Sequence, residues 1–293
     1  MKLDGRILYL TEDAELIVQQ LAGDDAGSVD LPLHYGVNTD GMISGRACTL
    51  GYTPAVLGPY FLENFKESVP KDGIKGGGFQ VVVGGDAYGS GSSREVAVVA
   101  HQGAGIELVV AKSFQRIFQE NMVYAGMPFT TNFSVIDRLN EGEDIDISDF
   151  HNELPPFFKQ VAQTGGLLPY ASAWLAGELE PWYDTARPAR PMNVVEKIIA
   201  ARGWSGGAPG HDGGPGFGLN DVQPGDQVLC RAGFRGMHEY TAGMVMALYE
   251  EAFGKVQVHE PDQCASFEDH FVLIGEPTVP DAVKSTRQAP AQR

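Results

Sequence analysis

The stretch GGDAYGSGSSREVAVVA contains two adjacent serines and an arginine, Ser92, Ser93 and Arg94. They stand at the end of its glycine-rich part, where a helix-like run begins. Free backbone N–H groups, two hydroxyls and a guanidinium at a helix N-terminus favour an anion, because the peptide dipoles there already attract negative charge. Phosphate and carboxylate both suit an arginine, which can bind either through two parallel hydrogen bonds. The stretch predicts an anion site. In the structural alternative, Ser92 and Glu95 only form a capping box.

Nucleotide-binding motifs fit this stretch poorly. The lysine of a P-loop is missing, and in a G-x-G-x-x-G pattern Arg94 takes the place of the third glycine. From the residues alone, a small-anion site and a structural turn both stay open.

Other residues with chemical potential are isolated in the sequence. Asp269 and His270 are adjacent, and a histidine beside an acid can act as a general acid or base, yet neighbours on a strand point to opposite faces. Asp40 in NTDGMIS and His238 in GMHEYTAG are equally weak signals. No C-x-x-C and no metal-ligand spacing of histidines occurs, and the cysteines lie far apart at Cys48, Cys230 and Cys264.

The elements that must position the serine–arginine turn alternate in type. Apolar runs rich in β-branched residues and bounded by glycine are typical of buried strands, and runs opened by Ser or Thr are typical of helices. Residues 6–21 begin as a strand and continue as a helix. Further strands are expected within 76–87 and 106–112, and further helices within 92–105 and 113–126. The alternation predicts α/β layer packing.

Capping residues predict where these helices begin and end. Thr11 and Ser113 stand where N-caps are expected, and Gly126 where a C-cap is expected. Gly103 or Gly105 would end the helix that follows the serine–arginine turn.

The second half of the chain is more interrupted. Residues 179–193 contain three prolines and little periodicity, as an exposed connector does. Helices are expected at 194–202 and 241–254, separated by a glycine-rich loop at 203–218 and by a turn and strand at 222–234.

Taken together, three motifs in the first half resemble the swivel domain of the aconitase superfamily. GGDAYGSGSSREVA is similar to its G-x-G-S-S-R-E turn, GIELVVAKSFQRIF to its strand and K-S-F-x-R-I helix, and VNTDGMIS to its T-D-x-I-S loop. In the second half, NVVEKIIAARG, VQPGDQVLCRAGFRGMHEYTAG and FEDHFV resemble the start of the cluster-binding large subunit of isopropylmalate dehydratase.

The resemblance implies a fold and a domain organisation. The expected fold class is α/β: an aconitase-type swivel domain with a mixed sheet and flanking helices, followed by a partial α/β segment resembling the start of the large subunit. The swivel domain would occupy residues 1–180, and a Pro/Gly-rich linker with a short helix residues 181–220. A large-subunit-like fragment with a disordered tail would occupy residues 221–293.

The resemblance also implies catalytic roles. Ser92 matches the serine that removes the proton next to a substrate carboxylate, while Ser93 and Arg94 match residues that hold that carboxylate and the turn. Asp269 and His270 match a pair that assists departure of the hydroxyl by donating a proton.

Three further residues are expected to bind substrate. Asp40 matches the acid of the T-D loop, His238 matches a position near substrate and cluster, and Arg46 is the stand-in for a basic residue expected after that loop. Val96 replaces the histidine usual after S-S-R-E, so one supporting hydrogen bond is not expected here.

The cofactor implied by the resemblance is a 4Fe–4S cluster whose open iron acts as a Lewis acid on the substrate. Its cysteine ligands belong to the part of the large subunit beyond the segments matched here, and the three cysteines of this chain do not correspond to them. The chain alone is therefore expected to bind no metal. A cluster-binding large subunit, or the remainder of a truncated product, is the expected partner in a heteromer.

Charge and composition bear on the other partner classes. The 293 residues carry a net charge of −17 with no basic run, which argues against binding to a nucleic-acid backbone. No apolar run reaches the roughly 18 to 20 residues of a membrane span, and MKLDGRILYL lacks the pattern of a signal peptide. We expect a cytoplasmic protein that takes a small carboxylate as substrate and binds neither nucleic acid nor membrane.

Two functions follow from these expectations. One is a subunit of an iron–sulfur-dependent hydro-lyase that dehydrates and rehydrates a 2-hydroxy di- or tricarboxylate of the isopropylmalate or aconitate kind. The alternative is a non-catalytic carboxylate-binding module of the same fold with a regulatory or assembly role, motivated by the missing cluster ligands.

Overall fold

The computed structural model describes most of the chain: residues 3–24, 31–63, 65–92, 94–146, 148–151, 154–207, 216–255, 257–258 and 261–267. Three residues that the sequence assigns to the site, Ser93, Asp269 and His270, lie outside these ranges. None of the helices in the described ranges combines the length and the apolar character that a membrane span requires.

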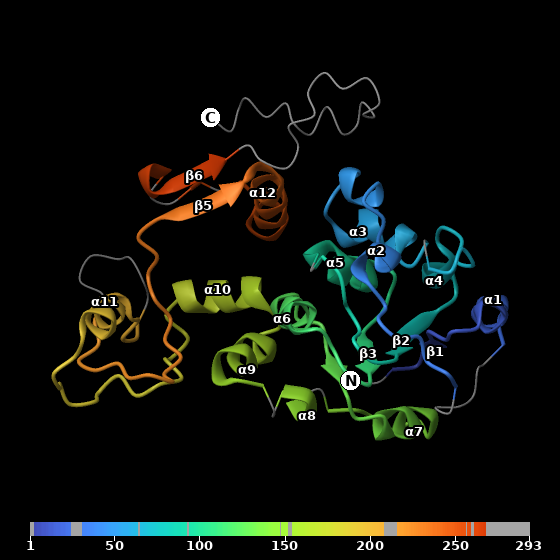
Figure 1. Ribbon diagram of the computed structural model, residues 1–293, viewed down its shortest axis with the longest axis horizontal. Coiled ribbons are helices and arrows are strands. Elements are labelled where there is room, and N and C mark those ends of the chain that lie inside the picture. The colour runs from blue at the N-terminus through green and yellow to red at the C-terminus, as the bar shows by residue number, and fades with distance from the viewer. Residues whose placement is uncertain are drawn as a thin grey trace, which may run out of the picture.

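A four-stranded sheet forms the centre of the first half (Figure 1). Its strands lie in the order β1 (Arg6–Tyr9), β2 (Phe79–Gly84), β3 (Leu108–Ala111) and β4 (Phe129–Thr130). The α/β class is confirmed, but the expectation of a mixed sheet is wrong for these strands, because every pairing is parallel. Connections that contain helices carry the chain back across the sheet, so that each strand starts at the same end, as parallel pairing requires.

Helices fill these connections. Between β1 and β2 lie α1 (Ala14–Ala22), α2 (Thr39–Met42), α3 (Pro54–Leu57) and α4 (Gly73–Gly76), with single 3-10 turns η1 (Ala47–Thr49) and η2 (Gly58–Tyr60). Helix α5 (Glu95–Gly103) joins β2 to β3, α6 (Arg116–Tyr124) joins β3 to β4, and α7 (Ser134–Asn140) follows β4.

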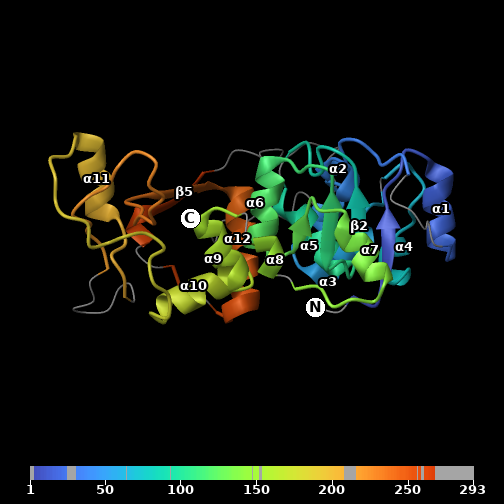
Figure 2. The same ribbon diagram turned by 90° about the horizontal axis from the view of Figure 1, so that it is seen from below.

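Both faces of the sheet are buried. Val82 and Val109 face a core that includes α5 and α6, whereas Val81, Val83 and Val110 face a second core with α7. Successive strand residues point to opposite faces, and helices cover both, so the strands are almost continuously apolar. Figure 2 shows the sheet between these helical layers.

Two N-cap predictions are wrong because tertiary contacts use the residues differently. The N-cap of α1 is Asp13, whose carboxylate accepts from the Glu15 N–H, while Thr11 is buried. Helix α6 begins only at Arg116, and the Ser113 hydroxyl instead accepts from the Ala87 N–H at 2.9 Å.

The second half contains more helix than strand. Helix α8 (Ser148–His151), α9 (Pro156–Gln163) and α10 (Leu167–Leu175) precede the predicted connector, and α11 (Val194–Arg202) and α12 (Glu239–Phe253) agree with the two predicted helices. A two-stranded parallel sheet pairs β5 (Arg235–His238) with β6 (Cys264–Phe267), beside the 3-10 turn η3 (Pro261–Gln263).

The strand predicted within 222–234 is wrong. Only an isolated bridge between Gly203 and Cys230 forms in that stretch, and the regular strand starts at Arg235. Residues 222–228 instead line a pocket together with Val195, Glu196 and Ile199 of α11.

The connector packs against its neighbours. Trp182 lies 5.2 Å from Phe157 between ring centroids, and Trp174 lies 6.0 Å from Trp204. The Tyr183 hydroxyl donates to the Trp204 carbonyl at 2.5 Å. These contacts attach α11 to the α9–α10 region, while the three-part domain division stays a prediction.

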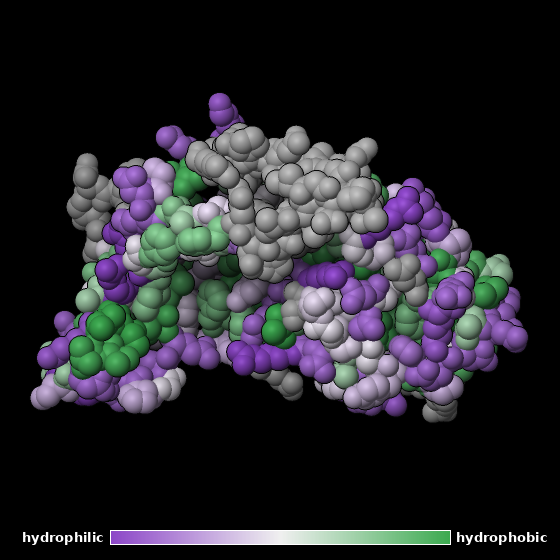
Figure 3. Space-filling view, turned by 45° about the horizontal axis from the view of Figure 1, so that its top comes forward, coloured by the Kyte–Doolittle hydropathy of each residue, from purple (hydrophilic) through white to green (hydrophobic). Residues whose placement is uncertain are grey.

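An apolar surface lies on α11. Its side chains Val194, Val195 and Ile198 are 70%, 59% and 61% exposed. Figure 3 shows apolar residues, in green, gathered at the end of the molecule where α11 lies.

Candidate functional site

A loop that starts at the carboxyl end of β2 leads to the serine–arginine turn. Tyr88 anchors the loop before it, since its N–H donates to the Ser113 carbonyl at 3.0 Å and its carbonyl accepts from the Gln115 N–H at 2.8 Å. The Gly89 N–H donates to the Val37 carbonyl at 2.9 Å. The loop is thus tied both to the segment after β3 and to the segment that contains the T-D motif.

Two glycines are needed for the path of this loop. Gly89 and Gly91 have φ of +81° and +91°, a left-handed conformation that other residues rarely adopt. A Cβ on Gly89 would also lie 2.1 Å from Cγ of Phe118. The glycine-rich sequence therefore serves close packing against α6 as well as the turn itself.

The T-D loop and the serine–arginine turn are joined by hydrogen bonds. The Thr39 N–H donates to the Ser90 carbonyl at 2.9 Å, and the Ser90 hydroxyl donates to the Gly36 carbonyl at 2.9 Å. Asn38 caps α2 by accepting from the Gly41 N–H at 2.6 Å, which orients the loop around Asp40. The structure thus brings together two motifs that are far apart in the sequence.

An ion pair connects the two motifs. Nη1 of Arg94 lies 2.9 Å from Oδ1 of Asp40, and the two side chains are 30% and 63% exposed. A pair this exposed contributes little to stability, generally less than about 1 kcal/mol. Arg94 has further N–H groups in its planar fork, so pairing with Asp40 leaves donors for a second carboxylate.

The capping-box alternative is wrong. Helix α5 begins at Glu95, its N-cap position is Arg94, and no side chain caps it. Arg94 has an extended backbone with φ −86° and ψ 119°, which places Ser92 outside the first helical turn. Ser92 is exposed, so its hydroxyl is accessible to a ligand at the positive end of α5.

Glu95 is the acidic residue at this helix start. Burial raises the pKa of its carboxyl group. The carboxyl group of Glu95 therefore keeps its proton to a higher pH than an exposed glutamate does.

The other residues that the sequence assigns to the site belong to separate segments of the chain. Arg46 is exposed and follows Gly45, where a Cβ would lie 4.0 Å from Nη1 of Arg94. His238 ends β5 and caps α12, accepting from the Thr241 N–H at 3.3 Å. Ser93, Asp269 and His270 cannot be placed because they lie outside the described residues.

The described residues do not fit an iron–sulfur cluster. Nowhere in the described ranges do three His, Cys, Asp or Glu side chains gather as a metal site requires. Cys48 is buried, Cys230 is exposed and Cys264 is partly exposed. Cluster ligation needs thiolates that converge on one iron centre, an arrangement not found among these residues.

A buried polar pair beside the turn was not foreseen from the sequence, where His101 was one of several unassigned histidines. The Tyr88 hydroxyl lies 2.7 Å from Nε2 of His101, and Nδ1 lies 2.7 Å from the Ala97 carbonyl. Because a carbonyl only accepts, Nδ1 carries the proton and Nε2 accepts from Tyr88. Burial lowers the pKa of His101 to about 4 and raises that of Tyr88.

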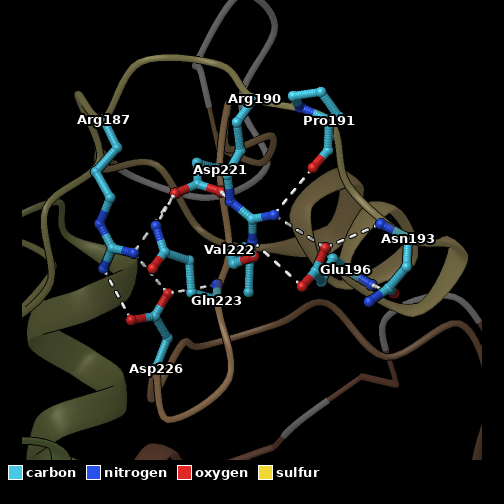
Figure 4. A network of polar contacts seen from close by, with 9 residues as sticks. All are labelled: Arg187, Arg190, Pro191, Asn193, Glu196, Asp221, Val222, Gln223 and Asp226. Carbon is cyan, nitrogen blue, oxygen red and sulfur yellow. Dashed lines mark hydrogen bonds and ion pairs between the residues drawn. The ribbon is translucent and has the colours of Figure 1, made fainter.

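A second unforeseen network orders the connector before α11 (Figure 4). Arg187 binds Asp226 through both Nη atoms, at 2.8 and 2.9 Å. Arg190 pairs through Nε with Asp221 at 2.7 Å and through Nη2 with Glu196 at 3.2 Å. Each of these charges has an opposite partner, so the network indicates a structural role.

Comparison with known proteins gives matches for the first half. The family profile described as the Aconitase C-terminal domain matches residues 74–132. The isopropylmalate/citramalate isomerase small subunit of Methanocaldococcus jannaschii is 32% identical over 155 residues, which are 48% of this chain and 89% of that protein. The 3-isopropylmalate dehydratase small subunit of Aliarcobacter butzleri is 35% identical over 153 residues, 47% of this chain and 88% of that protein.

A crystal structure of a 3-isopropylmalate dehydratase from Methanocaldococcus jannaschii aligns with 59% of this chain and 94% of its own, at 25% identity and a TM-score of 0.37. These relatives leave about half of the present chain without a counterpart. Over the matched half, the identity and the nearly complete coverage of the relatives establish the relationship. The chain belongs to the aconitase superfamily, in the family of isopropylmalate dehydratase small subunits.

Proposed function

We propose that this chain is a subunit of an iron–sulfur-dependent hydro-lyase or isomerase that dehydrates and rehydrates a 2-hydroxy di- or tricarboxylate. The observation that carries the proposal is the junction of the T-D loop with the serine–arginine turn, where Arg94 pairs with Asp40 beside the exposed Ser92. Membership of a family whose named members are dehydratase and isomerase small subunits supports it.

In the proposed reaction, the residues of the turn bind and deprotonate the substrate. Arg94, with Ser93, holds a substrate carboxylate through charge-assisted hydrogen bonds. The Ser92 Oγ takes the proton from the carbon next to that carboxylate. It can do so only as an alkoxide, and the Arg94 charge and the N-terminal end of α5 are the groups that stabilise this anion.

The other roles remain parts of the proposal. Asp269 and His270 would protonate the departing hydroxyl, and His238 and Arg46 would contact the substrate. The cluster would reside on a large partner subunit, because the described residues of this chain do not fit it. The complex is proposed to work in the cytoplasm without nucleic-acid or membrane partners.

Co-expression with a cluster-bearing large subunit tests the proposal. The expected product is a brown, iron-containing complex that dehydrates isopropylmalate, citramalate or citrate. Ser92→Ala should reduce kcat by at least about 100-fold, since proton transfer by a positioned group contributes about 10²–10⁴-fold.

The matched control is Ser134→Ala, because Ser134 is also an exposed serine but lies on α7. Its activity should equal that of the wild-type complex. Full activity of the Ser92→Ala complex would refute the role of Ser92. If the isolated chain binds the carboxylate tightly and no iron-bearing protein is recovered with it, the chain is a non-catalytic carboxylate-binding module instead.

A further inference from the structure

The pair formed by Tyr88 and His101 spans the serine–arginine turn. Tyr88 stands in the loop just before the turn, and His101 lies on α5, the helix that starts just after it. Both side chains are 0% exposed, and their hydrogen bond of 2.7 Å joins the residue before Gly89 to the last turn of α5 from within the core.

Aromatic rings enclose this hydrogen bond. The ring of Phe61 lies 4.1 Å from the His101 ring, and the ring of Phe118 lies 5.9 Å from His101 and 5.7 Å from Tyr88. In such surroundings neither polar group can exchange its partner for water, so breaking the bond leaves a buried group unsatisfied. The bond therefore fixes the separation of the loop and α5 more firmly than a surface contact can.

Backbone hydrogen bonds to Val37 and Thr39 hold residues 89 and 90 of the turn. The side-chain contacts on the outer side of the turn are weaker constraints. The Arg94–Asp40 pair is largely exposed, and such pairs open at little cost. The Ser90 hydroxyl bond to the Gly36 carbonyl holds only one residue of the turn. The internal bond between Tyr88 and His101 instead ties the loop before the turn to the helix after it.

We propose that Tyr88 and His101 are positioning residues of the carboxylate site, and that their hydrogen bond holds the backbone of residues 89–92 and the start of α5 in the geometry that presents Ser92 and Arg94 to the substrate. The proposal rests on the proposed function for its catalytic consequence. Neither side chain reaches the surface, so neither contacts the substrate. Small displacements of a reacting group lower the rate strongly, which is why such a brace matters.

The first test measures the turn in the full chain without any partner. Tyr88→Phe and His101→Leu remove the donor and the acceptor, whereas His101→Gln retains a side-chain oxygen that can accept from Tyr88. The amides that report on the turn are those of Gly89, which donates to the Val37 carbonyl, and Thr39, which donates to the Ser90 carbonyl. Their exchange should accelerate at least about 10-fold in the first two variants, because the turn opens locally more often. His101→Gln should restore most of the protection.

Tyr170→Phe is the matched control. Tyr170 is also buried, at 4% exposure, but its hydroxyl has no hydrogen-bond partner among the described residues and it lies on α10. Its removal should leave exchange in the turn unchanged. If folded Tyr88→Phe shows wild-type exchange in the turn, the proposal is refuted; if it does not fold, the comparison of His101→Gln with His101→Leu decides in its place.

The second test measures isopropylmalate dehydration by the complex with a cluster-bearing partner. Tyr88→Phe and His101→Leu should lower kcat about 10-fold or more through the displacement of Ser92, and should raise KM through that of Arg94. His101→Gln should recover activity. An active wild-type complex with unchanged kcat in both variants would refute the positioning role and leave the proposed function standing. An inactive wild-type complex would count against the proposed function, and amide exchange would still decide whether the pair holds the turn.

Discussion

The buried His101 predicts a specific loss of stability in mild acid. Its pKa is lowered from 6.5 to about 4 by burial, so the unfolded chain takes up a proton at a higher pH than the folded chain does. The stabilisation from a neutral His101 is therefore complete above the unfolded pKa and decreases as the pH falls from 6.5 towards 4. At pH 5 the pKa difference has cost about 2 kcal/mol, since each pH unit below 6.5 costs about 1.4 kcal/mol.

Urea unfolding at pH 7 and pH 5 measures this loss. Wild type and His101→Gln share every other titrating group, including His151, whose pKa is also lowered by burial, and Glu95, whose raised pKa acts in the opposite direction. The free energy of unfolding should fall between the two pH values by about 2 kcal/mol more in wild type than in His101→Gln. Equal losses in the two proteins would show that the pKa of His101 is not lowered in the folded chain.

Two further predictions concern stability at neutral pH. Gly89→Ala should lower the free energy of unfolding by about 3 kcal/mol, because its backbone is left-handed and the new Cβ would overlap Phe118. The control Gly76→Ala has open space around its Cβ and should change the free energy of unfolding by less than about 1 kcal/mol. Equal urea midpoints of the two variants would contradict this reasoning. Arg190→Ala should lower the urea midpoint more than removal of Arg116 does, because Asp221, 2% exposed, loses its closest charged partner. Removing the 88% exposed Arg116 should cost under about 1 kcal/mol, and similar costs would contradict the burial argument.

Local sequence patterns predicted elements well where the pattern itself determines the structure. The β-branched runs at Phe79–Gly84 and Leu108–Ala111 became central strands, and the helix at Val194–Arg202 starts with the capping box of Asn193 and Glu196. Helices α9 and α10, with the aromatic residues between them, were not predicted. Their apolar side chains pack on α6 and on the connector, and the sequence alone does not show these packing partners.

Capping was predicted less well because the same spacing serves different purposes. Ser92 and Glu95 have capping-box spacing, and Ser113 opens a helix-like run, yet neither serine caps a helix. Ser113 binds the Ala87 N–H across the sheet edge. A hydroxyl that satisfies a donor on another segment is unavailable to its own helix, and sequence spacing does not reveal that competition.

The sequence by itself determined the alternation of strands and helices, the glycine-rich turn with Ser92 and Arg94, and the family to which these motifs point, since each depends on residues close together in the chain. Only the tertiary structure decided that Arg94 pairs with Asp40, that Tyr88 binds His101 beneath the turn, and that Arg190 pairs with Asp221. Such pairings depend on how the packed sheet and helices bring separate segments together. Where burial has removed the competing water, as at Tyr88 and His101, a polar group keeps the partner that packing places beside it.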